Sequence, residues 1–224
     1  GIRHISLSTN ASILTEKKSI ELINAGLHEI MLSIDSVDKE PYEKLRVGLD
    51  YDRVIKNIRT LFRVRNDMQA DMVIRVRGVS FYDLNKPEHR QEIKRWEDFW
   101  GTLRKPQDRI YMKRAHNWGN QIELGDSQES DDVYHPCIVP WSNLHVTAMG
   151  KVPLCPQDYD GAVDIGDINT HSIAEVWRNA KWAEIRKMHA SGKRNDISFC
   201  QGCRMFDDEK NHLENWEEKN LSVK

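Results

Sequence analysis

Short apolar runs alternate with helical apolar stripes along the first half of the chain. Strand patterns, in which apolar residues alternate or run continuously, cover residues 2–8, 27–34, 72–76 and 109–114. Apolar positions three or four residues apart predict helices at 16–25, 51–65 and 88–103. Strand followed by helix at this spacing is typical of βαβ units. We therefore expect an α/β fold with a parallel sheet, and ligands at the carboxyl ends of its strands.

The second half follows a different pattern. Residues 143–146 and 151–154 flank Met149-Gly150 and predict a β-hairpin. Ser172 and Glu175 form a capping box, which predicts a single helix ending at Gly192. The acidic stretch 125–132 predicts a solvated linker, and the charged residues from Asp207 onward predict a polar tail.

The amino-acid composition and net charge limit the classes of binding partner that we expect. The 224 residues hold 33 Lys+Arg and 35 Asp+Glu, for a net charge of −2. This balance gives no general attraction to nucleic acid or to an anionic membrane, so neither is an expected partner. No apolar run approaches the length of a membrane span, and the polar first residues do not resemble a signal peptide. We expect a cytoplasmic protein whose cysteines stay reduced.

All four cysteines lie in the second half, as C-x17-C-x44-C-x2-C: Cys137, Cys155, Cys200 and Cys203. The C-x2-C pair favours metal binding over a disulfide in a reducing compartment. An iron–sulfur cluster and a four-cysteine zinc site both fit this donor set, and a redox C-x-x-C beside two buried cysteines is the third interpretation. Four thiolates around a cluster keep a double negative charge that needs compensation, for which Lys151 and Arg204 are candidates.

Several motifs together resemble the radical S-adenosylmethionine (SAM) enzymes with a C-terminal SPASM or Twitch domain. The cysteines with Gly150 match the opening of the SPASM signature, C…G-x4-C…C-x2-C. Ser8-Thr9-Asn10-Ala11 is similar to the third barrel strand of the family. Ser33-Ile34-Asp35, followed by Arg46, is similar to the fourth.

The resemblance implies a fold and a domain plan. Residues 1–123 would form a partial (β/α) barrel, residues 124–206 a small α+β Twitch-like domain with a hairpin and a helix, and residues 207–224 a polar tail. A full SPASM domain has seven cysteines, so the four present here imply one auxiliary 4Fe-4S cluster. Cys137, Cys155, Cys200 and Cys203 would be its ligands.

The resemblance also implies a SAM site. Thr9, Asn10 and Ser33 would lie near SAM, with Arg46 nearby, while Arg114, His116, Asn117 and Trp118 would either face substrate or cap a strand. The C-x3-C-x2-C motif that holds the SAM cluster in this family is absent, because the first 136 residues contain no cysteine. We therefore expect this chain alone to be inactive toward SAM. Either about two βα units precede Gly1 in the intact protein, or the chain is a natural variant without them.

The function implied is radical-based modification or oxidation of a peptide or carbohydrate-like substrate. The cofactors would be the auxiliary 4Fe-4S cluster and, in the intact protein, SAM and a second 4Fe-4S cluster. Flavodoxin or ferredoxin would supply electrons. No catalytic acid or base is assigned. The alternative is a non-catalytic recognition module with zinc on the four cysteines.

Overall fold

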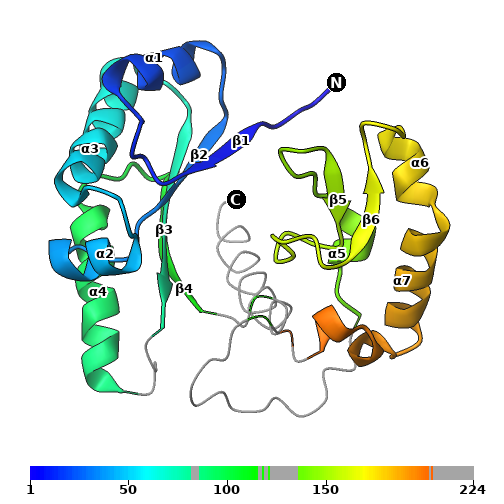
Figure 1. Ribbon diagram of the computed structural model, residues 1–224. Coiled ribbons are helices and arrows are strands. Elements are labelled where there is room, and N and C mark those ends of the chain that lie inside the picture. Colours follow the sequence, from blue (N-terminus) through cyan, green and yellow to red (C-terminus); the bar gives the residue numbers. More distant parts are fainter. Residues whose placement is uncertain (82–85, 116–117, 119–120, 122–135, 202, 204–224) are drawn as a thin grey trace, which may run out of the picture. The chain divides into compact units, whose positions relative to one another are not determined.

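The computed structural model describes residues 1–81, 86–115, 118, 121, 136–201 and 203 (Figure 1). The chain divides into two compact units, residues 1–115 and 116–224, which are considered separately. The predicted domain limits at 123/124 and 206/207 fall outside the described residues, as do the predicted linker at 125–132 and the tail.

The first unit is a four-stranded parallel sheet with helices on one face (Figure 1). Its elements in chain order are β1 (Ser6–Thr9), α1 (Glu16–Asn24), β2 (Glu29–Ser33), α2 (Lys39–Leu45), α3 (Tyr51–Asp67), β3 (Val73–Ser80), α4 (Pro87–Gly101) and β4 (Arg109–Arg114). The strands follow the chain order β1-β2-β3-β4, and every neighbouring pair is parallel. The predicted α/β class is confirmed, and a parallel sheet covered on one face is the arrangement of a barrel segment.

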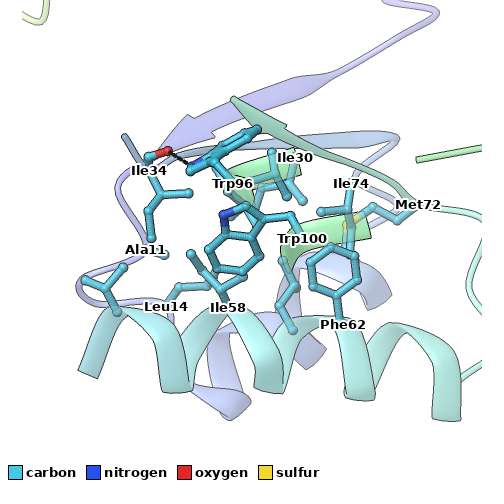
Figure 2. Packing of buried hydrophobic residues seen from close by; sticks show 14 of the residues in the cluster. Ala11, Leu14, Ile30, Ile34, Ile58, Phe62, Met72, Ile74, Trp96 and Trp100 are labelled. Carbon is cyan, nitrogen blue, oxygen red and sulfur yellow. Dashed lines mark hydrogen bonds between the residues drawn. The ribbon is translucent and has the colours of Figure 1, made fainter. Parts of the chain in front are cut away.

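The core of this unit lies between the sheet and the helices. Ile30 pairs with Ile74 in the β2–β3 register, and both are fully buried. Trp96 and Trp100 of α4 pack against them, and Trp96 Nε1 donates to the Ile34 carbonyl at 3.0 Å (Figure 2). That bond satisfies the polar atom of a buried indole and holds the backbone just after β2.

A buried ion pair closes the opposite edge of the sheet, where β3 and β4 begin. Arg65 and Asp108 have fully buried side chains and pair through two bonds, 2.8 Å at Arg65 Nη1 and 2.6 Å at Arg65 Nη2. Asp108 also accepts from the backbone nitrogens of Ile74 and Lys105 at 2.9 and 2.7 Å. Arg65 donates to the Met72 carbonyl at 3.0 Å. Both charges are therefore satisfied without water.

The second unit combines a small antiparallel sheet with short helices. Its elements are α5 (Val139–Ser142), β5 (Lys151–Pro153), β6 (Asp164–Asp167), α6 (Ile173–Arg178), α7 (Ala180–Ala190) and two 3-10 turns, η1 (Arg194–Asp196) and η2 (Ser198–Cys200). Its core includes Val152, Leu154, Ile165, Val176 and Trp182. The predicted capping box is present at Ser172 and Glu175.

The hairpin predicted between residues 143–146 and 151–154 is not formed, because β5 pairs with a different segment. β5 pairs with β6, and residues 143–146 form no strand. Thr147 N instead bonds the Lys151 carbonyl at 2.9 Å across a tight turn, while Ile168 N bonds the Gly150 carbonyl at 2.9 Å. Gly150 has φ +81°, and a side chain there would collide with Asn169. The turn is thus shaped by the chain after β6, which lies far along the sequence.

The single helix predicted from Ser172 to Gly192 is also wrong, because it is two helices. Asn179 adopts an extended conformation (φ −68°, ψ 166°) between α6 and α7. Its side chain accepts from Trp182 N at 2.8 Å, so it caps the second helix, and it donates to the Ile165 carbonyl at 2.8 Å. This tertiary bond to β6 outweighs the local preference for one continuous helix.

Candidate metal centre

The four cysteines lie on separate parts of the second unit and line one cavity. Cys137 precedes α5, Cys155 follows β5, Cys200 ends η2 and Cys203 follows it. Together with them, the cavity is lined by Val139, Pro140, Leu154, His189, Arg194 and Phe199. Residues as far apart in sequence as Cys137 and Cys203 are thus brought to one place by the fold.

Tight turns hold these cysteines. Cys200 N donates to the Ile197 carbonyl at 2.8 Å, and Cys203 N donates to the Cys200 carbonyl at 3.2 Å. After β5 the chain turns again, with Asp158 N donating to the Cys155 carbonyl at 3.1 Å. Such turns let closely spaced sulfurs face the same centre.

Two kinds of metal centre use four cysteine ligands. Within the described residues, no group of three or more His, Cys, Asp or Glu side chains is placed to hold one metal ion. A zinc ion requires four sulfurs at about 2.3 Å from a single point. In a four-iron cluster each cysteine binds a different iron, so the sulfurs surround a larger body. The shared cavity is compatible with the second arrangement.

Burial keeps the thiols of Cys155 and Cys200 protonated when they are free. It raises the pKa of Cys155 to about 11 and that of Cys200 to about 12, with neighbouring cysteine sulfurs adding to the rise. A thiolate in this cavity therefore needs a compensating positive charge. Metal binding supplies that charge and releases the thiol protons.

Arg194 places a cation beside the cysteines. Its side chain is buried, with 2% of the residue exposed, and Nη2 donates to the Cys203 carbonyl at 2.6 Å. Its Nε and Nη1 are buried and have no hydrogen-bond partner among the residues that the structure describes. A buried guanidinium with unpaired N–H groups at a cavity wall fits an anionic occupant. The donor set and this cation together fit an iron–sulfur cluster.

His189 connects two of the cysteines. Cys137 N donates to His189 Nδ1 at 3.2 Å, and His189 Nε2 lies 3.7 Å from Cys200 Sγ. The ring is buried and has the edge of Trp141 against it, with ring centroids 6.0 Å apart. Burial, followed by the charge of Arg194, lowers the pKa of His189 to about 4. The imidazole is therefore neutral at ordinary pH.

Neither Arg194 nor His189 was predicted from the sequence. The lysine predicted to supply charge, Lys151, pairs with Asp167 at 3.0 Å. The other predicted cation, Arg204, lies outside the described residues. Arg194 and His189 precede Cys200 by six and eleven residues, but no spacing rule connects an arginine or a histidine to a cysteine motif.

The predicted SAM-contacting residues lie in the first unit, three of them at the carboxyl edge of its sheet. Thr9 and Ser33 end β1 and β2, and Asn10 follows Thr9. Thr9 Oγ1 accepts from Ala11 N at 3.1 Å, and Asn10 Oδ1 accepts from Ser12 N at 3.0 Å. These side chains thus shape the loop after β1.

Arg46 acts through a carboxylate. Its Nε donates to Asp35 Oδ2 at 2.5 Å, and Asp35 Oδ1 accepts from Val79 N at 2.8 Å. This arrangement ties the segment after β2 to β3. Asp35 also borders a hollow lined by Ser36, Leu45, Phe81 and Trp96, among others.

The residues predicted either to face substrate or to cap a strand are mostly outside the described part of the chain. These are the side chain of Arg114 and the whole of His116 and Asn117. Trp118 is described, and its backbone has φ +47°.

A family model matches the part of the second unit that holds the cysteines. Residues 137–204 match SPASM, an iron–sulfur cluster-binding domain. The match begins at the first cysteine and includes all four.

Two curated proteins are similar over part of their length. The S-adenosyl-L-methionine-dependent 2-deoxy-scyllo-inosamine dehydrogenase of Niallia circulans is 33% identical over 67 residues, which are 30% of this chain and 27% of that enzyme. The probable GTP 3′,8-cyclase of Methanococcus maripaludis is 40% identical over 63 residues, 28% of this chain and 21% of that protein. The matched parts thus span about a quarter of these relatives.

The fold is similar to solved structures. Streptococcus suis SuiB bound to precursor peptide SuiA superposes with a TM-score of 0.53 and 16% identity, over 91% of this chain and 53% of SuiB. SuiB bound to S-adenosylmethionine gives a TM-score of 0.51 and 15% identity, over 82% and 50%. Among helices in the described residues, none has the length and apolar character needed to cross a bilayer.

Proposed function

We propose that this chain belongs to an enzyme performing radical-based modification or oxidation, because residues 137–204 match the SPASM iron–sulfur domain and follow a parallel α/β sheet whose fold is similar to that of SuiB. Cys137, Cys155, Cys200 and Cys203 are the proposed ligands of one auxiliary 4Fe-4S cluster. The observation that carries this proposal is the single cavity lined by all four cysteines.

The surrounding residues support an anionic cluster there. Such a cluster, when bound, supplies one-electron transfer. Arg194 places at the cavity wall two N–H groups without a partner among the described residues and offsets negative charge, while Val139, Leu154 and Phe199 give the wall an apolar character. An apolar cavity wall that includes the buried Arg194 cation stabilises an anionic group, which apolar residues alone would disfavour.

The first unit is the proposed SAM-binding part. Thr9, Asn10 and Ser33 lie where parallel sheets bind ligands, at the carboxyl ends of strands. Arg46 orders this edge through Asp35, which also holds β3. We assign SAM contact to the first three residues and a positioning role to Arg46.

The proposed substrate is a peptide side chain or a carbohydrate-like alcohol. Two similarities support these classes: one relative is named for a 2-deoxy-scyllo-inosamine dehydrogenase activity, and SuiB is bound to a precursor peptide. Flavodoxin or ferredoxin is the proposed electron donor, and the cytoplasm the proposed compartment. Turnover of either class by an enzyme that includes this chain, followed by mass spectrometry, distinguishes loss of two hydrogens from a new cross-link.

The metal content of the chain tests the cluster assignment. Purified without oxygen and reconstituted with iron and sulfide, the wild-type chain is expected to bind about four irons and about four sulfides. Metal analysis and sulfide assay measure both. One zinc per chain without sulfide would support the four-cysteine zinc module instead.

The chain alone is expected to release no 5′-deoxyadenosine from SAM in the presence of dithionite. Its four cysteines are assigned to the SPASM cluster, and none remains to hold a second one. Chromatography of the reaction detects the product. The control is a radical SAM enzyme with its own C-x3-C-x2-C motif under the same conditions. Product above background from this chain would refute the expectation.

A further inference from the structure

One imidazole nitrogen faces a cysteine sulfur at the candidate cluster site. His189 Nε2 lies 3.7 Å from Cys200 Sγ, within the range of a hydrogen bond to sulfur. His189 belongs to α7, and Cys200 ends η2, so the contact joins two elements of the same unit. The ring is buried, with 1% of the residue exposed.

The second ring nitrogen determines which atom carries the hydrogen. Cys137 N donates to His189 Nδ1 at 3.2 Å, so Nδ1 presents its lone pair. A neutral imidazole then carries its one hydrogen on Nε2. Nε2 is therefore a donor aimed at the sulfur of Cys200, and the orientation is set by a backbone amide.

We propose that His189 is a positioning residue that donates its Nε2–H to Cys200 Sγ and thereby raises the reduction potential of the SPASM cluster. The inference rests on the proposed function, since it requires Cys200 to be a cluster ligand. His189 acts on the cluster through this sulfur.

The electrostatic reason is the charge change on reduction. The added electron spreads over the cluster and its sulfurs, and a hydrogen bond to a sulfur stabilises the more negative state. The effect is enlarged in a cavity with a mainly apolar lining, where a dipole is poorly screened. The hydrogen bond affects the sulfur of Cys200. The other ring nitrogen of His189, Nδ1, accepts from the backbone nitrogen of Cys137 rather than from the Cys137 sulfur.

Two substitutions separate the two contacts of the ring. In His189→Gln the longer amide reaches the position of Nε2 and keeps an N–H toward Cys200. In His189→Asn the shorter amide oxygen replaces Nδ1 as acceptor for Cys137 N, but it does not reach Cys200. His189→Leu removes both contacts. His171→Leu, at an exposed histidine of the same unit, is the matched control.

An EPR-monitored redox titration of the reconstituted chains measures the potential. At a fixed potential, His189→Asn and His189→Leu are expected to lower the ratio of reduced to oxidised cluster by about three- to tenfold, where tenfold corresponds to about 59 mV for one electron. His189→Gln is expected to recover most of the wild-type ratio, and His171→Leu to leave it unchanged. Iron content should stay at the wild-type level in His189→Asn and His189→Gln.

A vibrational readout reports the hydrogen bond directly. The Fe–S(Cys) stretches in resonance Raman spectra should shift on exchange into D₂O in the wild type and less in His189→Asn. Equal potentials and equal isotope shifts in wild type, His189→Asn and His189→Gln, with full iron content, would overturn the inference while leaving the proposed function standing. If the wild type assembles no cluster, the proposed function itself fails. If His189→Leu does not fold, the Asn and Gln pair decides.

Discussion

Cys155→Ala is expected to lower the iron content of the reconstituted chain from about four irons to about three or fewer. Cys155 is the only proposed ligand on the β5 side of the cavity, and alanine has no donor for the iron there. A cluster held by three thiolates exposes one iron to loss. Iron and sulfide analysis, with the visible absorbance of the cluster, measures the change.

A neighbouring substitution controls for general damage to that loop. Tyr159→Phe lies four residues further along the chain at an exposed position, and it should retain full iron. Circular dichroism checks that both variants remain folded. Full iron content in folded Cys155→Ala would show that the ligand set is wrong. Equal loss of iron in Tyr159→Phe would show that the loop, rather than the thiolate, is responsible.

Asp108→Ala is expected to lower the free energy of unfolding of the chain by about 3–5 kcal/mol. The substitution leaves the Arg65 guanidinium buried without its carboxylate and removes the acceptor of the Ile74 amide. An uncompensated buried charge is among the most destabilising changes to a folded core. Urea unfolding followed by tryptophan fluorescence reports on both units, since Trp96 and Trp100 are in the core of the first and Trp182 is in the core of the second, and the change is expected in the transition of the first unit.

An exposed ion pair provides the comparison for this effect. Asp98 pairs with Lys94 at 2.7 Å on the surface of α4, and Asp98→Ala should change the midpoint of unfolding little. The double variant Arg65→Met with Asp108→Leu should recover part of the stability lost in Asp108→Ala, since it removes both charges. Equal midpoints for Asp98→Ala and Asp108→Ala would contradict the role assigned to the buried pair.

The parallel sheet was predictable because its signals are local. Thr15 caps α1, with its side chain accepting from Lys18 N, and Gly26 follows the helix with φ +76°. β3 runs further than predicted, to Ser80, because Gly78 permits a close approach: a Cβ there would lie 2.9 Å from the Ile34 carbonyl oxygen. Helix α2 has no extended apolar stripe and was not predicted.

Where a distant residue decides the local conformation, prediction failed. Asn179 breaks the helix through a hydrogen bond to the Ile165 carbonyl. The conformation at Gly150 depends on Asn169, because a side chain at position 150 would collide with it. The cysteines could be found from their spacing alone. Arg194 and His189 could not, since their relation to the cysteines exists only after η1, η2 and α7 are folded.

Two buried N–H groups of Arg194, which have no partner in the part of the chain that the structure describes, affect how stable the protein is in a cell. When no anion is bound in the cavity, burial of the unsatisfied guanidinium lowers the stability of the fold by about 1–3 kcal/mol. The iron-free chain therefore opens more often and offers its backbone to proteases. We expect the cellular amount of this protein to fall when iron is scarce, because the iron-free form is degraded first.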